Sequence, residues 1–182
     1  AGSFAMSKQS LTVNDDAITT FDADVLSLSL TGVNLFVGVG GALNVAKDDI
    51  VTTGAIGFEA TGVNLSLALV QDTADPANKY TGLEISSLDA SLIGIPGLTF
   101  EVSNGKVQVN QGPASAPRLN WSAATVTDAT HDPDGILPAF TMTAAVELAA
   151  SGDVAFDAFG FVVGAGSFAM SKQSLTVNDD AI

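Results

Sequence analysis

The aspartates of this sequence include three pairs that could bind a cation: Asp15 with Asp16, Asp48 with Asp49, and Asp132 with Asp134. Oxygen ligands at alternate positions followed by glycine are typical of calcium loops, and residues 132–135 (Asp-Pro-Asp-Gly) begin in that way. The complete EF-hand loop and the glycine-rich calcium nonapeptide are both missing from the sequence. Aspartate is also a common residue of solvent-exposed turns. We therefore predict no metal site and no cofactor, with calcium at these pairs as the alternative.

Catalytic chemistry has few candidate residues. His131 is the only histidine, and the chain contains no cysteine, which excludes a thiolate nucleophile and any zinc site built on several of these ligands. No serine lies in a Gly-x-Ser-x-Gly elbow. The glycine-rich stretches at 37–41 and 160–166 lack the Lys-Ser/Thr ending of a phosphate-binding loop. We predict that the protein is not an enzyme and has no catalytic or cofactor-binding residues.

Charge restricts the partners of this protein. Six Lys and Arg residues against 20 Asp and Glu residues give a net charge of −14. Nucleic acid would be repelled by such a surface, so we exclude it as a partner. No apolar run approaches the roughly 18–20 residues that span a bilayer, so we expect no transmembrane segment. Strong acidity would instead keep a many-copy array soluble.

A long exact repeat dominates the organisation of the chain. Residues 1–18 recur letter for letter as residues 165–182, which gives a period of 164 residues. We expect residues 1–164 to be one full tandem repeat and residues 165–182 the start of the next, so that neither end is a natural terminus. Neighbouring repeats of the same protein are then the predicted partners. Residues 168–177 should complete the preceding unit or begin the following one.

Local patterns predict an all-β chain. Leu26, Leu28 and Leu30 alternate with serines, as in half-buried strands, and 18 glycines and 6 prolines supply corners. Residues 31–35 (Thr-Gly-Val-Asn-Leu) recur at 61–65, thirty residues later. Five sub-units of about 33 residues would fill one period, which favours a β-solenoid of stacked coils. A β-sandwich repeat domain is the alternative, because the proline-rich stretch 113–138 breaks the regular spacing.

Three phrases, at residues 32–41, 80–83 and 157–169, resemble repeats of giant exported bacterial surface proteins of the adhesin type. The resemblance implies a structural segment of an extracellular filament, stalk or biofilm matrix at the cell surface, and brings no catalytic residues. Two other functions stay open. One is an adhesin-type module that binds calcium or glycan, and the other is a lipid-conducting β-groove of the cell envelope.

Overall fold

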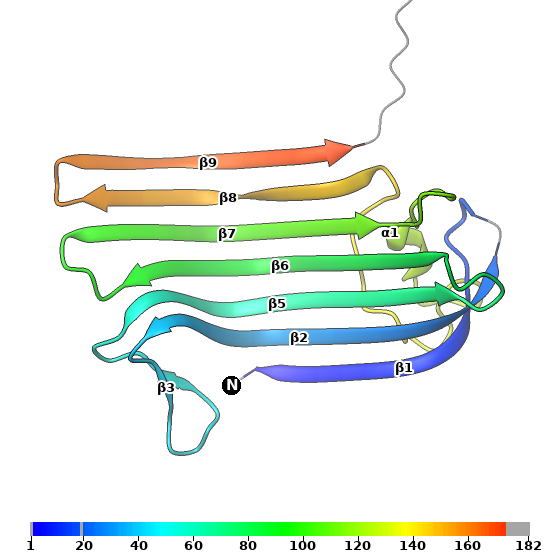
Figure 1. Cartoon of the computed structure of the whole chain (residues 1–182), viewed down its shortest axis with the longest axis horizontal. Coiled ribbons are helices and arrows are strands. Elements are labelled where there is room, and N and C mark those ends of the chain that lie inside the picture. The colour runs from blue at the N-terminus through cyan, green and yellow to red at the C-terminus, as the bar shows by residue number, and fades with distance from the viewer. Residues whose placement is uncertain (1, 19, 174–182) are drawn as a thin grey trace, which may run out of the picture.

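The computed structural model describes residues 2–18 and 20–173, and its main element is one antiparallel sheet (Figure 1). Seven strands lie in the order β1-β2-β5-β6-β7-β8-β9, and every pair of neighbours is antiparallel. Their bounds are β1 Ser3–Val13, β2 Phe21–Val39, β5 Ile56–Asp72, β6 Lys79–Ile93, β7 Leu98–Gln111, β8 Val146–Ala158 and β9 Val162–Gln173. The predicted all-β class is confirmed.

Two short elements accompany the sheet. Strands β3 (Ala42–Leu43) and β4 (Ile50–Val51) form a small hairpin between β2 and β5. Helix α1 (Trp121–Ala124) is a single turn between β7 and β8. Among the described residues, no helix is both long and apolar enough to cross a membrane.

The described strands do not form the predicted solenoid. A solenoid coil would bring parallel strands of successive coils together, whereas here each long strand turns back antiparallel on its predecessor. The repeated phrase at residues 31–35 and 61–65 lies in two adjacent strands, β2 and β5, so its spacing reflects the length of a hairpin. The alternative β-sandwich would need a second large sheet, and the described part of the chain has only the two-stranded hairpin sheet beside the main one.

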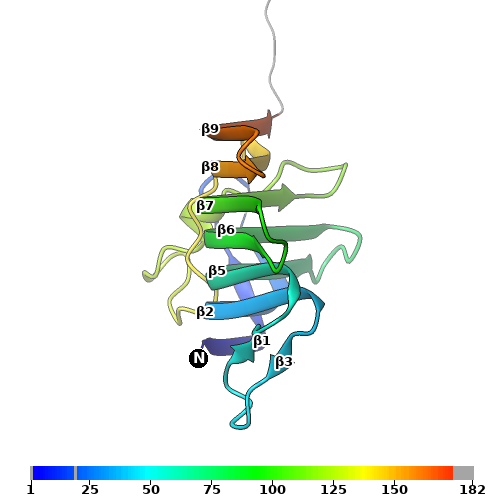
Figure 2. The same cartoon turned by 90° about the vertical axis from the view of Figure 1, so that its left-hand side faces the viewer.

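The hydrophobic core lies on one face of the sheet, at one end of the strands. We call the chain between β7 and β8, residues 112–145, the covering segment, and it packs on this face (Figure 2). Trp121 of the segment is fully buried, and Gly82 of β6 lets its indole approach, because a Cβ there would lie 2.7 Å from the ring. The core combines small strand residues with large ones of the segment: Val13, Ala23, Val25, Ala68, Val70, Tyr80, Leu119, Trp121, Ala124, Leu137, Phe140 and Met142.

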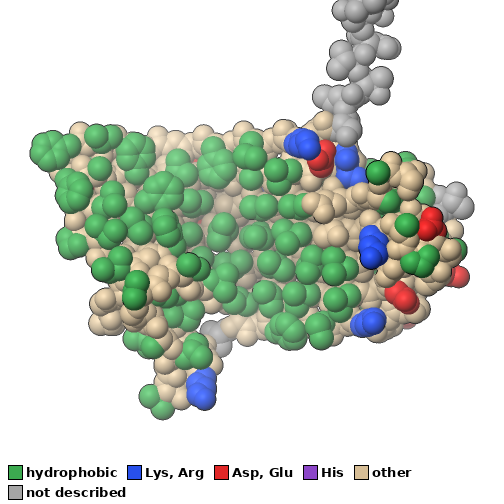
Figure 3. Space-filling model, viewed as in Figure 1, with side chains coloured by type: hydrophobic (Ala, Val, Ile, Leu, Met, Phe, Trp, Pro, Cys, Tyr) green, Lys and Arg blue, Asp and Glu red, His purple; other side chains and the backbone are tan. Residues whose placement is uncertain are grey.

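The opposite face of the sheet is apolar, and no described segment covers its centre (Figure 3). We call it the open face. Cross-strand register places two rows of its side chains in line across the strands. One row is Met6, Leu28, Leu67, Leu83, Val109 and Leu148; the other is Phe4, Leu30, Leu65, Ile85, Val107 and Ala150. These strands therefore have apolar side chains on both faces at the covered end.

Candidate interaction surfaces

The two edges of the sheet carry the same sequence. Residues 2–9 run into the first edge strand, β1, and the identical residues 166–173 form most of the last edge strand, β9. Six steps of antiparallel pairing separate the two strands, so they point in the same direction (Figure 1). Residues 168–173 of the predicted junction thus lie in β9, while residues 174–177 are outside the described residues.

The identical strands also have the same orientation in the sheet. Met6 is opposite Leu28 and Met170 is opposite Ala150, and both of these partners lie on the open face. With direction and face the same, the edge of β1 that pairs with β2 corresponds to the outer edge of β9. Nothing in the described part of the chain pairs with that outer edge. The unpaired outer edge of β9 is therefore equivalent to the edge of β1 that is hydrogen-bonded to β2.

Side chains fix β9 to its neighbour. The Ser167 hydroxyl donates to Asp153 Oδ1 at 2.6 Å, and Asn104 Nδ2 donates to the other oxygen of that carboxylate at 2.9 Å. These hydrogen bonds, that of Ser167 first, hold the pKa of Asp153 below its ordinary value. Lys172 forms an ion pair with Glu147, whose pKa is lowered mainly by that contact.

The first two aspartate pairs lie at opposite ends of β2. Asp15 is buried, and its carboxylate accepts hydrogen bonds from the backbone N–H groups of Ala17, Ile18 and Asn120. Asp49 belongs to the β3–β4 hairpin connection, where it accepts from Ile50 N and Asn34 Nδ2. Because a long strand separates the two pairs, the sheet does not bring them together.

The third pair organises the covering segment. Asp132 is 1% exposed, and its two oxygens accept from the backbone N–H groups of Ile136 and Leu137, each at 2.9 Å. Asp134 is exposed on the same loop. Since the oxygens of Asp15 and Asp132 already accept backbone hydrogen bonds, both act as loop-forming residues. Across residues 2–18 and 20–173, no three His, Asp or Glu side chains have an arrangement suited to a metal ion.

His131 links the covering segment to the turn after β1. Its Nδ1 lies 3.0 Å from Asp128 Oδ1, and its Nε2 lies 3.1 Å from Asp16 Oδ1. These carboxylates, Asp128 first, raise the pKa of His131 above 6.5. The pKa of Asp128 is lowered, mainly by the backbone N–H of Thr130 and then by His131. The sequence identified His131 as the only histidine but gave no sign of these partners.

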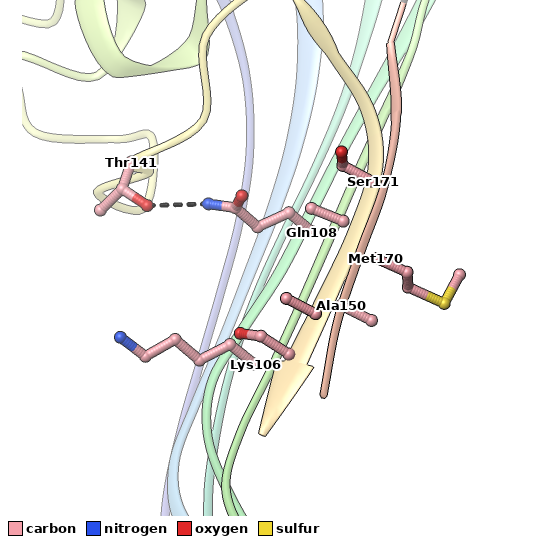
Figure 4. Close-up of a pocket in the computed structure, with 9 residues that line it drawn as sticks. Lys106, Gln108, Thr141, Ala150, Met170 and Ser171 are labelled. Carbon is pink, nitrogen blue, oxygen red and sulfur yellow. Dashed lines mark hydrogen bonds between the residues drawn. The ribbon is translucent and has the colours of Figure 1, made fainter. Parts of the chain in front are cut away.

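A pocket of about 440 Å³ with a mixed polar and apolar lining lies on the covered face beside β9 (Figure 4). Lys106 and Gln108 of β7 extend into it, and Gln108 Nε2 donates to Thr141 Oγ1 of the covering segment at 2.9 Å. Ser171 of β9 closes one side. This lining can hydrogen-bond a polar group.

The sequence predicted that residues 168–177 join neighbouring repeats, but it predicted neither the common orientation of β1 and β9 nor the open face. The edge relationship needs the strand order, since identity alone leaves the orientation of the two copies open. The open face could not be predicted, because leucine alternation marks an apolar side of a strand without showing whether another segment covers it. No protein family model, curated protein or solved structure matches this chain.

Proposed function

We propose that this chain is a non-catalytic structural repeat of a large extracellular filament, stalk or matrix protein, in which successive repeats continue one antiparallel sheet. The observation that carries the proposal is the equivalence of β1 and β9. In an array, one strand would serve as β9 of its own repeat and as β1 of the next. The β2 strand of the next repeat would then pair with its outer edge.

The number of strands supports this arrangement. One period of 164 residues contributes six strands to the main sheet, β1, β2, β5, β6, β7 and β8, before the sequence returns to its start. An even number of antiparallel strands restores the original direction, so each repeat can be added without a reversal. At about 4.8 Å per strand, each repeat would advance the array by about 29 Å. Strands would thus stack along the axis of the array, as expected of a solenoid, but they would belong to hairpins and not to coils.

A shared strand also solves the problem of exposed sheet edges. An unpaired edge strand can pair with other chains and cause aggregation. Within an array, every β9 would be paired on both sides, and only the two ends of the whole array would keep free edges. Acidic side chains, which dominate the charge of −14, would keep such an array soluble.

A protein of two joined repeats tests the shared strand. Register places Ala5 opposite Ser29, so Ala169 should lie opposite Ser29 of the following repeat. Cysteines at these two junction positions should form a disulfide, because directly opposed residues lie about 4.5–5.5 Å apart. The chain has no cysteine of its own to interfere. Mass spectrometry after alkylation of free thiols measures the oxidised fraction.

The matched control moves the second cysteine by one residue, to Leu28 of the following repeat. Adjacent strand residues point to opposite faces, so this pair should stay reduced. Equal oxidation of both pairs, or of neither in a folded protein, would rule out the continuous sheet. In longer arrays, fibre diffraction should give an axial period of about 29 Å. Antibodies against this repeat should label intact cells that carry the parent protein, and labelling only after permeabilisation would contradict the extracellular location.

A further inference from the structure

The open face has the composition of an interface core. Its central rows hold leucine, isoleucine and valine, and its far half adds three aromatic side chains, Phe58, Phe100 and Phe156, each between 38% and 48% exposed. Phe58 and Phe100 make an edge-to-face contact with ring centroids 6.2 Å apart. Alternation along β8 places Phe156 on the same face as Leu148. Large apolar patches of this kind mark interaction sites on soluble proteins.

The size of the open face matches what a stable dimer needs. Seven strands about 4.8 Å apart give a width of about 30 Å, and the 13 residues of β8 give a length of about 43 Å. The product is about 1,300 Å², whereas a stable interface buries about 800 Å² on each partner. One chain therefore offers a face large enough for a specific contact without help from another surface.

Charge on this face allows two copies to approach. The whole chain has a net charge of −14, but from β1 to β8 the central rows of the open face carry no charged side chain. At the covered end of the strands, Lys8, Asp24 and Lys79 line one pocket, Asp22 lies on the same face of β2 as Asp24, and Lys172 pairs with Glu147. These charges nearly balance, so mutual repulsion is weakest across this face. Such a balance also gives no particular attraction for an anionic lipid headgroup.

We propose that the open face binds the open face of a second copy of this chain, which forms a two-layer sandwich of identical sheets. Two antiparallel sheets pack about 10 Å apart with interdigitating side chains, and this would cover the leucine rows of both copies. The inference does not rest on the shared strand at the edges, because a single unit presents the complete face. Face pairing and edge pairing use different surfaces and can fail independently.

Sedimentation equilibrium of the 182-residue protein measures its association. We expect a dimer in reversible equilibrium with monomer. Leu67→Arg places a charge at the centre of the open face and should give a monomer at the same concentrations. The matched control is Ser91→Arg, since Ser91 is on the opposite face between Glu59 and Glu101, and it should leave the dimer intact. Near-ultraviolet circular dichroism of Trp121, which is buried on the other face, checks that each variant is folded.

A milder substitution gives a second measurement in case Leu67→Arg fails to fold. In Leu67→Cys, iodoacetamide should alkylate the cysteine only in the monomer. At a protein concentration about ten times the dimer Kd, about one fifth of the protein is monomer by mass action, so alkylation should be about fivefold slower than in dilute monomer. Ser91→Cys should show no such concentration dependence. A monomeric wild type, or a dimer that persists in folded Leu67→Arg, would overturn the proposal. Acyl lipid that co-purifies with a monomer and protects the cysteine of the Leu67→Cys variant would also overturn it, in favour of a lipid-binding face.

Discussion

Asn34 and Asn64 support each other's strands. Asn64 Oδ1 accepts a hydrogen bond from Gly32 N at 2.8 Å, and Asn34 Oδ1 accepts one from Gly62 N at 3.2 Å. Both glycines have a positive φ of 64° at the irregularity where the β2–β5 register shifts. The repeated Thr-Gly-Val-Asn-Leu phrase thus builds a symmetric double bulge, in which each copy satisfies the backbone of the other.

Removal of either asparagine should weaken this bulge. Asn64→Ala leaves Gly32 N without its acceptor and should lower the free energy of unfolding by about 1 kcal/mol. Asn64→Asp keeps an oxygen acceptor at the same place and is the matched control, with a smaller loss expected. Urea titration followed by circular dichroism measures both. Equal stability of Asn64→Ala and the wild type would show that the side chain does not hold the bulge.

Trp121 and Asn110 form the polar connection within the core. The indole Nε1 donates to Asn110 Oδ1 at 2.9 Å, and Asn110 Nδ2 donates to Leu119 O at 2.9 Å. Asn110→Leu leaves these buried groups unsatisfied and should cost about 2–4 kcal/mol of unfolding free energy. The control is Gln111→Leu, because the neighbouring Gln111 is exposed at the end of β7 and its replacement should change stability little. Urea unfolding followed by Trp121 fluorescence compares the two variants, and equal losses would contradict a special role for Asn110.

His131 should make stability depend on pH. Its pKa is raised in the folded protein by Asp128 and then by Asp16, so the charged form stabilises the fold. This contribution is complete below pH 6.5 and is lost as pH rises through the higher folded pKa. The urea midpoint should therefore fall from about pH 6 toward about pH 8. His131→Gln should remove most of this fall, and an unchanged pH profile in that variant would refute the assignment.

Lys8 and Lys172 occupy the same position of the repeated sequence but have different surroundings. Lys172 pairs with Glu147, whereas Lys8 has no carboxylate within ion-pair distance among the described residues. Lys172→Met should speed amide exchange in β9, and Lys8→Met should have little effect on β1. Lys172 lowers the pKa of Glu147, so the ion pair should stabilise β9 above the ordinary glutamate pKa of 4.5. This stabilisation should disappear as pH falls through the lowered pKa of Glu147. Similar exchange in both variants would contradict this difference.

The sequence predicted strand content better than strand pairing. Alternation of Leu26, Leu28 and Leu30 with serines correctly predicted a half-buried strand, now part of β2. The same period of two occurs in a solenoid coil and in a hairpin, so alternation alone could not choose between them. The choice depends on which strands pair, and that information lies in long-range contacts. Likewise, the role of Asp15 depends on Asn120, which is 105 residues away in the chain.

The opposite positions of β1 and β9 determine how the sheet would respond to tension. Force applied between the two edges acts across the strands, so it separates hydrogen bonds a few at a time, as in unzipping, instead of shearing a whole strand at once. A repeat of 164 residues would lengthen from about 29 Å to about 570 Å when fully extended. A fibre built in this way would yield over a long distance and refold hairpin by hairpin, so it would be extensible under tension.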